Sequence, residues 1–536
     1  MAKHNKKLRR SVRVEVFREY CANSSIHGVR YFDRDERTAC ERFILVASSL
    51  SAFVTRLWRD DTQDVREMES GSNHCYDLVT VWDIHFPAVT ICPETKVAAN
   101  RLNFTAEMNV LADDTHYNNE TSERKSSSVE RIKAVAQLCN IMFHSNYGWL
   151  NQVNGSEDNI VDMLKRLSLP WRTTVALCYY GTDFTECENQ LKVTLTEEGI
   201  CYTFNMLPDR EIFRKSAMHT DYIYTRNWYI FPGFQPPGPS YARDAGLDAG
   251  LTFYLAQKNE DTDYLCTGYS QGYKLKIHGI DEYPHMAKRN LRLPLGHEIS
   301  IALKPQMIVT SPSAADYSWE KRQCFFNHER YLRYFQIYNQ ENCELECLTN
   351  VTRAMCGCVR FSMPRSNDTK VCTLSMWHCM YRSKWFLRPI PGLKRQPHRV
   401  ILEMVKNCNC LPACSSVSYD VEMAQTSLDM EKFRLANNEL PRDHLDKFTI
   451  TTLAIYFKES YFITSKRSEL YGWVDFLANC GGLLGLFMGL SILSLLEICY
   501  FITIRPFSVR SRIASAEKRK SNEVQTAMLP VICKPE

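Results

Sequence analysis

The chain has 536 residues, a formal net charge of +4 and 22 cysteines. The length allows one large domain or several small ones, and the modest charge gives no reason to expect a nucleic-acid partner. So many cysteines are unusual in a cytosolic enzyme and typical of a domain that folds in an oxidising compartment. The first residues are basic and polar and lack the apolar core of a signal peptide.

The first predicted element after the N-terminal tail is a membrane span. Residues 43–58 form an apolar run that carries only Arg56, near its end, where an arginine can extend to the membrane interface. A buried helix of a soluble domain is the alternative interpretation. Basic residues upstream favour the membrane by the positive-inside rule, so we expect a cytoplasmic tail at 1–38 and a transmembrane helix at 39–59. The basic residues are Lys3, Lys6, Lys7, Arg9, Arg10, Arg13 and Arg18.

The region that follows, residues 60–470, is expected to be a disulfide-rich α+β ectodomain with a β-sheet core and peripheral helices. Four segments show the apolar alternation of strands, and two show the period of helices. The predicted strands are 174–181, 272–279, 416–423 and 452–457, the predicted helices are 130–142 and 330–353, and a Pro/Gly-rich loop covers 231–250.

Five N-x-S/T sequons lie in this region. One sequon alone is a weak signal, but five that are interleaved with 17 of the cysteines favour an oxidising, glycosylating compartment. Asn23 also begins a sequon, which we expect to be cytoplasmic and unused. The expected glycosylation sites are Asn103, Asn119, Asn154, Asn350 and Asn367.

Ten cysteines between residues 324 and 414 form a cluster whose spacing predicts a ladder of disulfides. Cys343 and Cys347 share a helical face about 6 Å apart along the axis. Cys408 and Cys410 share a strand face about 6.6 Å apart, so a helix antiparallel to a strand would be joined to it twice. The number of cysteines alone does not select this connectivity. The predicted pairs, from the outside inward, are Cys324–Cys414, Cys343–Cys410, Cys347–Cys408, Cys356–Cys379 and Cys358–Cys372.

Metal binding is the functional alternative for this cluster, because His378 and His398 lie nearby and C-x-C pairs can bind zinc. An oxidising compartment favours disulfides instead, so we expect no metal and no cofactor. No Cys–His signature of a catalytic cysteine stands out. The chain also has no G-x-S-x-G, H-E-x-x-H or phosphate-binding loop, and we therefore do not expect an enzyme.

A second and stronger membrane span covers residues 480–504, roughly 25 residues against the ~20 that a transmembrane helix needs. Its only formal charge is Glu497, and an ionisable group at membrane depth usually faces a partner or a water-filled path. Basic residues follow it, so we expect a transmembrane helix at 471–505 and a second cytoplasmic tail at 506–536. The basic residues are Arg505, Arg510, Arg512, Lys518, Arg519 and Lys520.

Five motifs follow one another along the chain. They are SSIHGVRYF before the first span, FPAVTICPE after it, GICYTFN, the cysteine cluster ending in CNCLPAC, and GGLLGLFMGLSILSLLEICYF in the second span. In this order they resemble the degenerin/epithelial sodium channel family, and their style is closest to its insect pickpocket branch. The resemblance covers nearly the whole chain. It implies a trimer of two-span subunits, homomeric or with related channel subunits, that conducts cations, usually prefers sodium and is often blocked by amiloride.

The second span is where the resemblance implies the ion-selective residues. Gly485 and Gly489, with another glycine four positions earlier, form one helical stripe, for which close helix packing is the alternative reading. Gly489, Leu490 and Ser491 match the family's G-x-S selectivity filter, with Leu490 bulkier than alanine or serine at the middle position. Glu497 matches the acidic residue below the filter, and three such carboxylates in a trimer would concentrate cations.

Four further residues take roles from the resemblance. Ala478 matches the position where bulky side chains lock such channels open, and Gly485 matches one linked to amiloride block. His27 and Gly28 match the cytoplasmic His-Gly gating motif. Asn479 is a departure, because acid-sensing members have aspartate there, and this weakens the case for gating by protons.

The family's disulfides match the predicted ladder and add two pairs outside it. Three cysteines of the ectodomain then remain. Cys139–Cys266 is a guess, which leaves Cys75 unpaired. The added pairs are Cys92–Cys201 and Cys178–Cys187.

We therefore expect a pore-forming subunit of a trimeric, amiloride-sensitive, sodium-selective channel in the plasma membrane, gated by a sensory stimulus on the ectodomain. The alternative is an auxiliary or non-conducting two-span sensory receptor subunit that needs a partner subunit. An ATP-gated receptor channel has the same topology, but the G-x-S and Cys-Asn-Cys motifs fit it poorly. The sequence does not identify the stimulus or the sodium-to-potassium preference.

Overall fold

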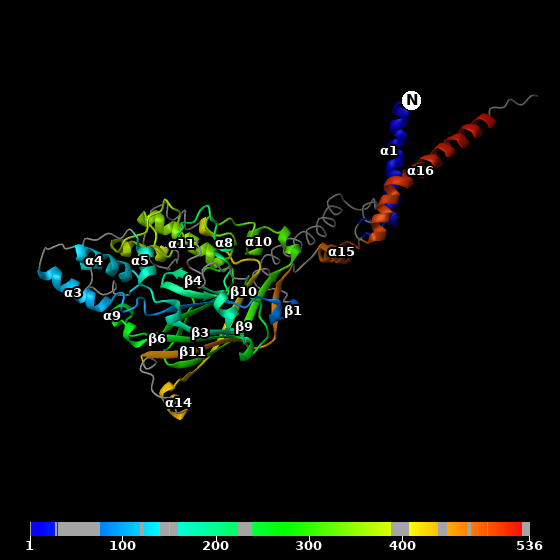
Figure 1. Cartoon of the computed structure of the whole chain (residues 1–536). Helices are drawn as coiled ribbons and strands as arrows, with labels where there is room; N and C mark the ends of the chain where they lie inside the picture. Colours follow the sequence, from blue (N-terminus) through cyan, green and yellow to red (C-terminus); the bar gives the residue numbers. More distant parts are fainter. Residues whose placement is uncertain are drawn as a thin grey trace, which may run out of the picture. The chain divides into compact units, whose positions relative to one another are not determined.

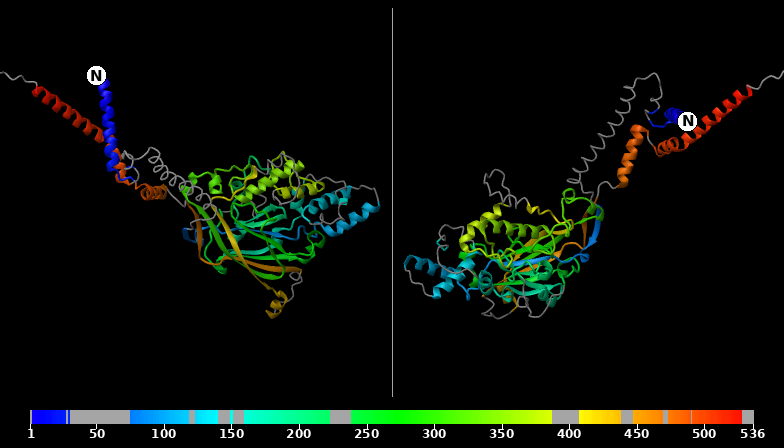
Figure 2. Two further views of the ribbon diagram at one scale, coloured as in Figure 1. Left: turned by 180° about the vertical axis from the view of Figure 1, so that it is seen from behind. Right: turned by 90° about the horizontal axis from the view of Figure 1, so that it is seen from above.

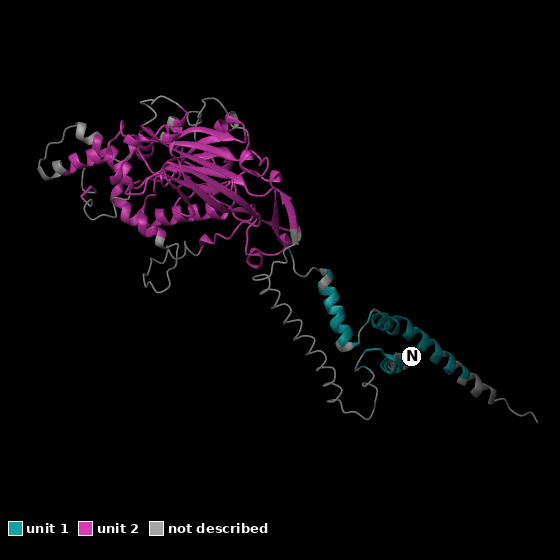
Figure 3. Cartoon of the chain, turned by 90° about the horizontal axis from the view of Figure 1, so that it is seen from below, with its two compact units in different colours: residues 1–73, 468–536 teal, residues 74–467 magenta. Residues whose placement is uncertain are grey.

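The computed structural model describes residues 2–26, 29, 75–117, 123–139, 149–150, 159–222, 238–386, 407–437, 447–468, 473–489 and 491–527. The chain divides into two compact units (Figure 3). The larger unit is His74–Arg467, and the smaller one combines Met1–Asn73 with Ser468–Glu536. The expected first span, 39–59, lies outside the described residues.

The larger unit contains a seven-stranded sheet with the order β1-β12-β9-β11-β6-β3, in which β10 also pairs with β9. β11 and β12 run parallel to β9, and the other pairs are antiparallel. Cys75 lies opposite Lys466, so the first and last strands of this unit leave it side by side. The strands are β1 Cys75–Thr80, β3 Val175–Tyr180, β6 Leu251–Lys258, β9 His297–Thr310, β10 Ser416–Ser427, β11 Phe448–Phe457 and β12 Tyr461–Arg467.

A second sheet of five antiparallel strands has the order β4-β5-β2-β7-β8. Its apolar side chains pack with those of the first sheet in one core, where Phe204 meets Phe253 at 6.5 Å between ring centroids. Every residue of the central strand β2 is buried, since it is covered on both faces. The strands are β2 Ala88–Pro93, β4 Leu191–Thr196, β5 Gly199–Phe204, β7 Tyr273–His278 and β8 Leu291–Leu293.

Most helices lie along one side and at one end of these sheets, and several of them share a second core, which contains Phe213 and Phe335 (Figure 1 and Figure 2). Short 3-10 helices at Val81–Asp83, Leu247–Ala249, Asn259–Asp261, Pro312–Asp316 and Leu374–Met376 join the strands. The α-helices are α3 Phe104–Tyr117, α4 Glu123–Ala136, α5 Ile160–Leu167, α6 Trp171–Thr174, α7 Phe184–Gln190, α8 Asp209–Ile212, α9 Tyr264–Thr267, α10 Trp319–Arg322, α11 Gln340–Cys356, α12 Trp377–Phe386 and α14 Met430–Ala436.

The α+β class and the four predicted strands are confirmed, the strands as β3, β7, β10 and β11. The predicted helix 330–353 is wrong in its first ten residues. Asn339 caps α11, because its side chain accepts a hydrogen bond from the Asn342 amide, and the helix therefore begins at Gln340. The predicted helix 130–142 is shifted, since α4 starts seven residues earlier and ends at Ala136.

Eight disulfides are found among the described residues of the larger unit, and they coincide with the predicted ladder, the two pairs implied by the family and the guessed pair. The strand expected at Cys408 and Cys410 is wrong: Cys408 ends a helical turn, and Asn409 follows with φ +24°, so the two cysteines do not lie on an extended segment. The disulfides are Cys92–Cys201, Cys139–Cys266, Cys178–Cys187, Cys324–Cys414, Cys343–Cys410, Cys347–Cys408, Cys356–Cys379 and Cys358–Cys372.

The described part of the smaller unit contains three helices, α1 Ala2–Asn23, α15 Trp473–Met488 and α16 Ile492–Ala527. α1 packs against α16 through Val12, Val16 and Val509, all of them buried. Among the helices built from described residues, none has both the length and the hydrophobicity needed to cross a membrane.

Candidate ion-conduction site

The site lies at a break between α15 and α16. The amide of Gly489 donates to the carbonyl of Gly485 at 3.0 Å, and Gly489 then turns to φ +61°. This left-handed conformation suits glycine, which has no Cβ to clash with the backbone, and it ends α15. Ser491 caps α16, since the amide of Ser494 donates to its Oγ at 3.3 Å. The G-x-S sequence therefore combines a helix stop with a helix start.

This break corrects the expectation of one continuous helix over 471–505. The apolar run of the second span continues through residues 480–504, but the turn at Gly489 interrupts the helical hydrogen bonds. The predicted glycine stripe therefore ends at Gly485, because Gly489 lies outside α15. Local turn chemistry overrides the hydrophobic pattern at this position.

Four oxygen-bearing side chains gather at the start of α16. We call Ser25, Ser491, Ser494 and Glu497 the hydroxyl–carboxylate cluster. The Oγ atoms of Ser491 and Ser494 are 3.3 Å apart, and those of Ser25 and Ser494 are 2.7 Å apart. Ser25 Oγ also donates to Oε2 of Glu497 at 3.1 Å. Ser494 is fully buried, whereas Ser491 is exposed, so the cluster reaches from the protein interior to the surface of the unit.

The N-terminal helix α1 positions Ser25. The ring of Tyr20 meets Phe501 edge-on with 5.4 Å between centroids, and the Arg505 guanidinium hydrogen-bonds to the Glu19 carboxylate. These contacts hold the end of α1 against α16, and Ser25 lies two residues after that end. The segment before the His-Gly motif is thus tied to the helix that begins at the G-x-S motif.

The predicted site residues are distributed over this unit as follows. Gly489 and Ser491 form the helix break, and Glu497 belongs to the cluster. Ala478 and Gly485 are exposed on α15. The structure brings in one residue that sequence reasoning missed, Ser25, and the only signal for it is its place two residues before the His-Gly motif. His27, Gly28 and Leu490 lie outside the described residues.

Three of the predicted glycosylation sites are described in the structure, and all three are exposed. They are Asn103, Asn350 and Asn367. Asn103 also caps α3, because its Oδ1 accepts from the amide of Ala106 at 3.0 Å. Asn119 and Asn154 lie outside the described residues.

A half-buried acidic pair in the larger unit contains a carboxyl whose pKa is shifted to near neutral pH. Asp281 and Glu282 follow β7, and the carboxylate of Glu282 accepts from the amide of Gly279 at 3.1 Å. Burial, with the Asp281 charge as a second cause, raises the pKa of Glu282 to about 7. The positive charge of Lys276 lowers this pKa, and the negative charge of Glu341 raises it. This carboxyl can exchange a proton between pH 6 and 8.

Comparison with known proteins identifies the class. A family model described as "Amiloride-sensitive sodium channel" matches residues 20–501. Pickpocket protein 28 of Drosophila melanogaster is 23% identical over 94% of this chain and 81% of its own length. Sodium channel protein Nach of the same species is 25% identical over 91% of this chain and 86% of its own. Acid-sensing ion channel 4-B of Danio rerio is 21% identical over 95% of this chain and 78% of its own length.

The chain belongs to the amiloride-sensitive sodium channel family, which includes the degenerins and the pickpocket proteins. This is a family of membrane ion channels and not of enzymes. The recognition made from the sequence motifs is confirmed.

Proposed function

We propose that this protein is a pore-forming subunit of a trimeric, amiloride-sensitive, sodium-selective channel in the plasma membrane, gated by a sensory stimulus that acts on its ectodomain. In this proposal the tails 1–38 and 506–536 are cytoplasmic, 39–59 and 471–505 cross the membrane, and 60–470 is extracellular. Family membership and the eight disulfides of the larger unit support this arrangement.

The observation that carries the proposal is the helix break at Gly489 and Ser491. A helix end leaves backbone carbonyls without partners in the helix. Inside a membrane such groups are tolerated only where protein or a water-filled path satisfies them. The carbonyl end of α15 carries partial negative charge, and hydroxyl oxygens of the cluster lie beside it. Broken helices of this kind place their carbonyl ends at cation sites in transport proteins.

Trimerisation would turn this break into a selective path. Three copies of Gly489 and Ser491 would surround one axis and replace part of the hydration shell of a sodium ion with oxygen atoms. Three copies of Glu497 would concentrate cations below this ring and repel anions. Gly485, exposed on α15, is our candidate for the amiloride-linked position.

The N-terminal segment is our candidate for gating. His27 and Gly28 follow directly after the segment that Ser25 ties to Ser494 and Glu497. Movement of this segment would therefore change the hydrogen bonds of the cluster. A stimulus on the ectodomain would then open or close the path by changing the equilibrium between the two states of these hydrogen bonds, made and broken.

Substitution of Ala478 by phenylalanine tests the proposal. Ala478 is exposed on α15, and a ring there is too large for a closed bundle of three helices, so the open state should be favoured. Voltage clamp of cells that express the Ala478→Phe form should record a constitutive sodium current that amiloride blocks. The Ala478→Ser form, with a small side chain, is the matched control and should stay silent. Silence of Ala478→Phe despite surface expression would contradict a homotrimeric pore and favour an auxiliary subunit.

A further inference from the structure

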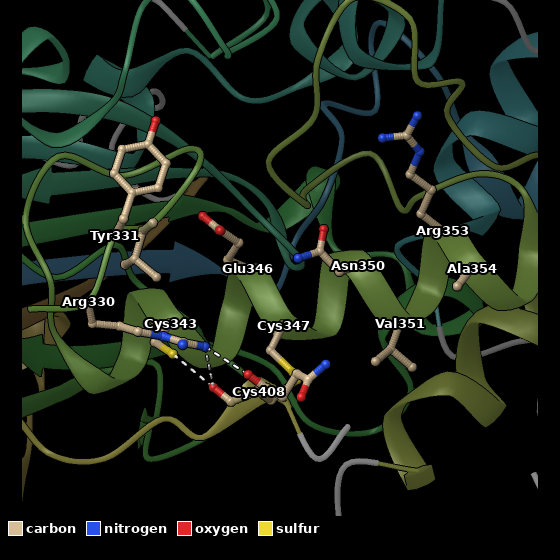
Figure 4. Close-up of a pocket in the computed structure, with 12 residues that line it drawn as sticks. Arg330, Tyr331, Cys343, Glu346, Cys347, Asn350, Val351, Arg353, Ala354 and Cys408 are labelled. Carbon is tan, nitrogen blue, oxygen red and sulfur yellow. Dashed lines mark hydrogen bonds between the residues drawn. A yellow bond between two sulfur atoms is a disulfide. The ribbon is translucent and has the colours of Figure 1, made fainter. Parts of the chain in front are cut away.

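A cavity of about 530 Å³ lies along α11 in the ectodomain (Figure 4). Its lining includes Cys343, Cys347 and Cys408. These cysteines belong to the disulfides Cys343–Cys410 and Cys347–Cys408, the two rungs that join α11 to the segment that follows Asn407. A volume of this size lies within the roughly 300–1,000 Å³ of sites that hold a small ligand. The channel proposal makes no use of this cavity.

Asn350 lies in the middle of the cavity lining. It is exposed on α11, and Figure 4 shows it between Glu346 and Arg353 along the helix. Asn350 is also the first residue of the sequon Asn350-Val351-Thr352. An N-linked sugar on its amide nitrogen would therefore start inside the cavity rather than on open surface.

We propose that the inner sugars of an N-linked glycan on Asn350 occupy this cavity and cover the Cys347–Cys408 rung. The inference rests on the extracellular location in the proposed function. Attachment forms a bond between Nδ2 of Asn350 and the anomeric carbon of a lipid-linked pyrophosphoryl oligosaccharide. The sugar–phosphate bond breaks, and a proton and the lipid pyrophosphate are released.

The lining offers the groups that bind sugars. Tyr331 is 71% exposed, and the guanidinium of Arg214 covers one face of its ring at 4.4 Å from the centroid. An apolar face of a sugar ring can pack on an exposed aromatic ring such as this one. Arg330 stands at the same end and donates to the carbonyls of Asn407 and Cys408, at 2.8 and 3.2 Å. Hydroxyl and acetamide groups of a glycan can hydrogen-bond to such polar walls directly or through water.

The sequon's own hydroxyl shows when the sugar must be attached. Thr352 is fully buried, and its Oγ1 lies 2.7 Å from the carbonyl of Leu348 and 2.8 Å from Oγ of Ser383 on α12. A transferase that needs this hydroxyl cannot reach it once α11 packs on α12. The glycan would therefore be attached before this part of the ectodomain folds, and the cavity would form around it.

The other described sequons serve as comparisons. Asn367 is exposed on a loop and does not line the cavity. It provides the matched control Asn367→Gln for the test variant Asn350→Gln. Asn103 is a poorer control, because its side chain caps α3.

Mass spectrometry of tryptic glycopeptides and hydroxyl-radical footprinting of the purified full-length protein test the proposal. Asn350 should carry a glycan, and oxidation of Tyr331 should rise about threefold in Asn350→Gln, since a site of this size buries most of the surface of its ligand and the ligand shields the side chains it packs on. Asn367→Gln should match the wild type, and Tyr269, which is 97% exposed, should react equally in all forms. Enzymatic removal of glycans from the folded wild type should also expose Tyr331, which keeps the test valid if Asn350→Gln folds poorly.

Three outcomes would overturn the inference, and they separate it from the proposed topology. A bare Asn350 beside a glycosylated Asn367, or equal Tyr331 oxidation with and without the glycan, would reject the cavity-bound glycan alone. An absence of sugar from every sequon would reject the extracellular location as well.

Discussion

Glu19 and Arg505 are 486 positions apart in the chain, yet both carboxylate oxygens of Glu19 accept hydrogen bonds from the Arg505 guanidinium, with 2.8 Å between Nε and Oε2. These hydrogen bonds hold the pKa of Glu19 below its usual value. A bidentate pair fixes orientation as well as distance. It therefore anchors the end of α1, and with it Ser25, against α16.

Breaking this pair should weaken the coupling between the N-terminal segment and the hydroxyl–carboxylate cluster. We expect Glu19→Gln, placed in the Ala478→Phe background, to reduce the whole-cell current severalfold without moving the reversal potential. Glu15→Gln, an exposed glutamate of the same helix, should leave the current unchanged. Exchange of the two charges, Glu19→Arg with Arg505→Glu, should restore part of it. Equal currents in Glu19→Gln and its parent would show that the pair does not act on the gate.

Ser491 should be sensitive to the size of its side chain. Ser491→Leu removes the oxygen that caps α16 and places a bulky group at the break, so we expect an altered sodium-to-potassium preference or loss of current. Reversal potentials in mixed sodium and potassium solutions measure the preference. Ser511→Leu, at an exposed position on α16, is the control for a leucine on this helix. A normal current with unaltered preference would remove Ser491 from the filter.

Glu282 should make the stability of the ectodomain depend on pH. Its pKa is raised to about 7, so the folded protein binds this proton more tightly than the unfolded chain does. The stabilisation that this proton gives to the folded state is complete below about pH 4.5, the ordinary pKa of a glutamate. It is lost as the pH rises through 7. The loss is on the order of 3 kcal/mol, at about 1.4 kcal/mol for each unit of pKa shift. Burial lowers the pKa of His278 to about 3, which acts in the opposite direction at low pH.

The effect of Glu282 is therefore measured as the difference in melting temperature between the wild type and Glu282→Gln. Melting temperatures of the wild type and Glu282→Gln should be compared between pH 5 and 8, since the His278 contribution cancels in the comparison. The wild type should lose stability relative to Glu282→Gln as the pH rises, and Asp248→Asn, at an exposed carboxylate, should track the wild type. Parallel curves for wild type and Glu282→Gln would contradict the raised pKa.

The ladder should be robust to the loss of one rung. Cys347–Cys408 lies next to Cys343–Cys410 along both segments, so removing it opens a loop of only a few residues. Cys92–Cys201 spans 109 residues without a parallel neighbour, and its loss should cost about 4–5 kcal/mol by the chain-entropy relation. We expect Cys347→Ala with Cys408→Ala to cost less than about 2 kcal/mol. Denaturant unfolding of the two double variants compares them, and a larger loss for the rung would show that it maintains native packing rather than closing a loop.

Several features of this protein could be predicted from residue spacing. The disulfide ladder follows from Cys343 and Cys347 sharing a helical face, and it forms even though Cys408 does not lie on a strand. The pairs were predicted correctly although the strand was not, because a disulfide depends on the distance between two Cα atoms, usually about 4.4–6.8 Å, and not on the type of secondary structure. Strands such as β10 were predictable because alternation of side chains is a local property.

The helix break illustrates what spacing does not reveal. The apolar run continues across residues 480–504, and it carries no information on the φ angle of Gly489. The N-cap at Asn339 was missed for the same reason, since periodicity ignores the hydrogen bond that starts a helix. Both signals were present in the residue types, but only as turn chemistry, which many glycines and asparagines share.

The sequence by itself determined the family, the α+β class and the five disulfides of the ladder, because these depend on motif order and on cysteine spacing. Only the tertiary structure decided that Ser25 meets Ser494, that Glu19 meets Arg505, and that Asn350 lines a cavity. The physical reason is that each of these relationships joins segments from different parts of the chain. Their distance is set by the packing of whole helices, which no local pattern of residues records.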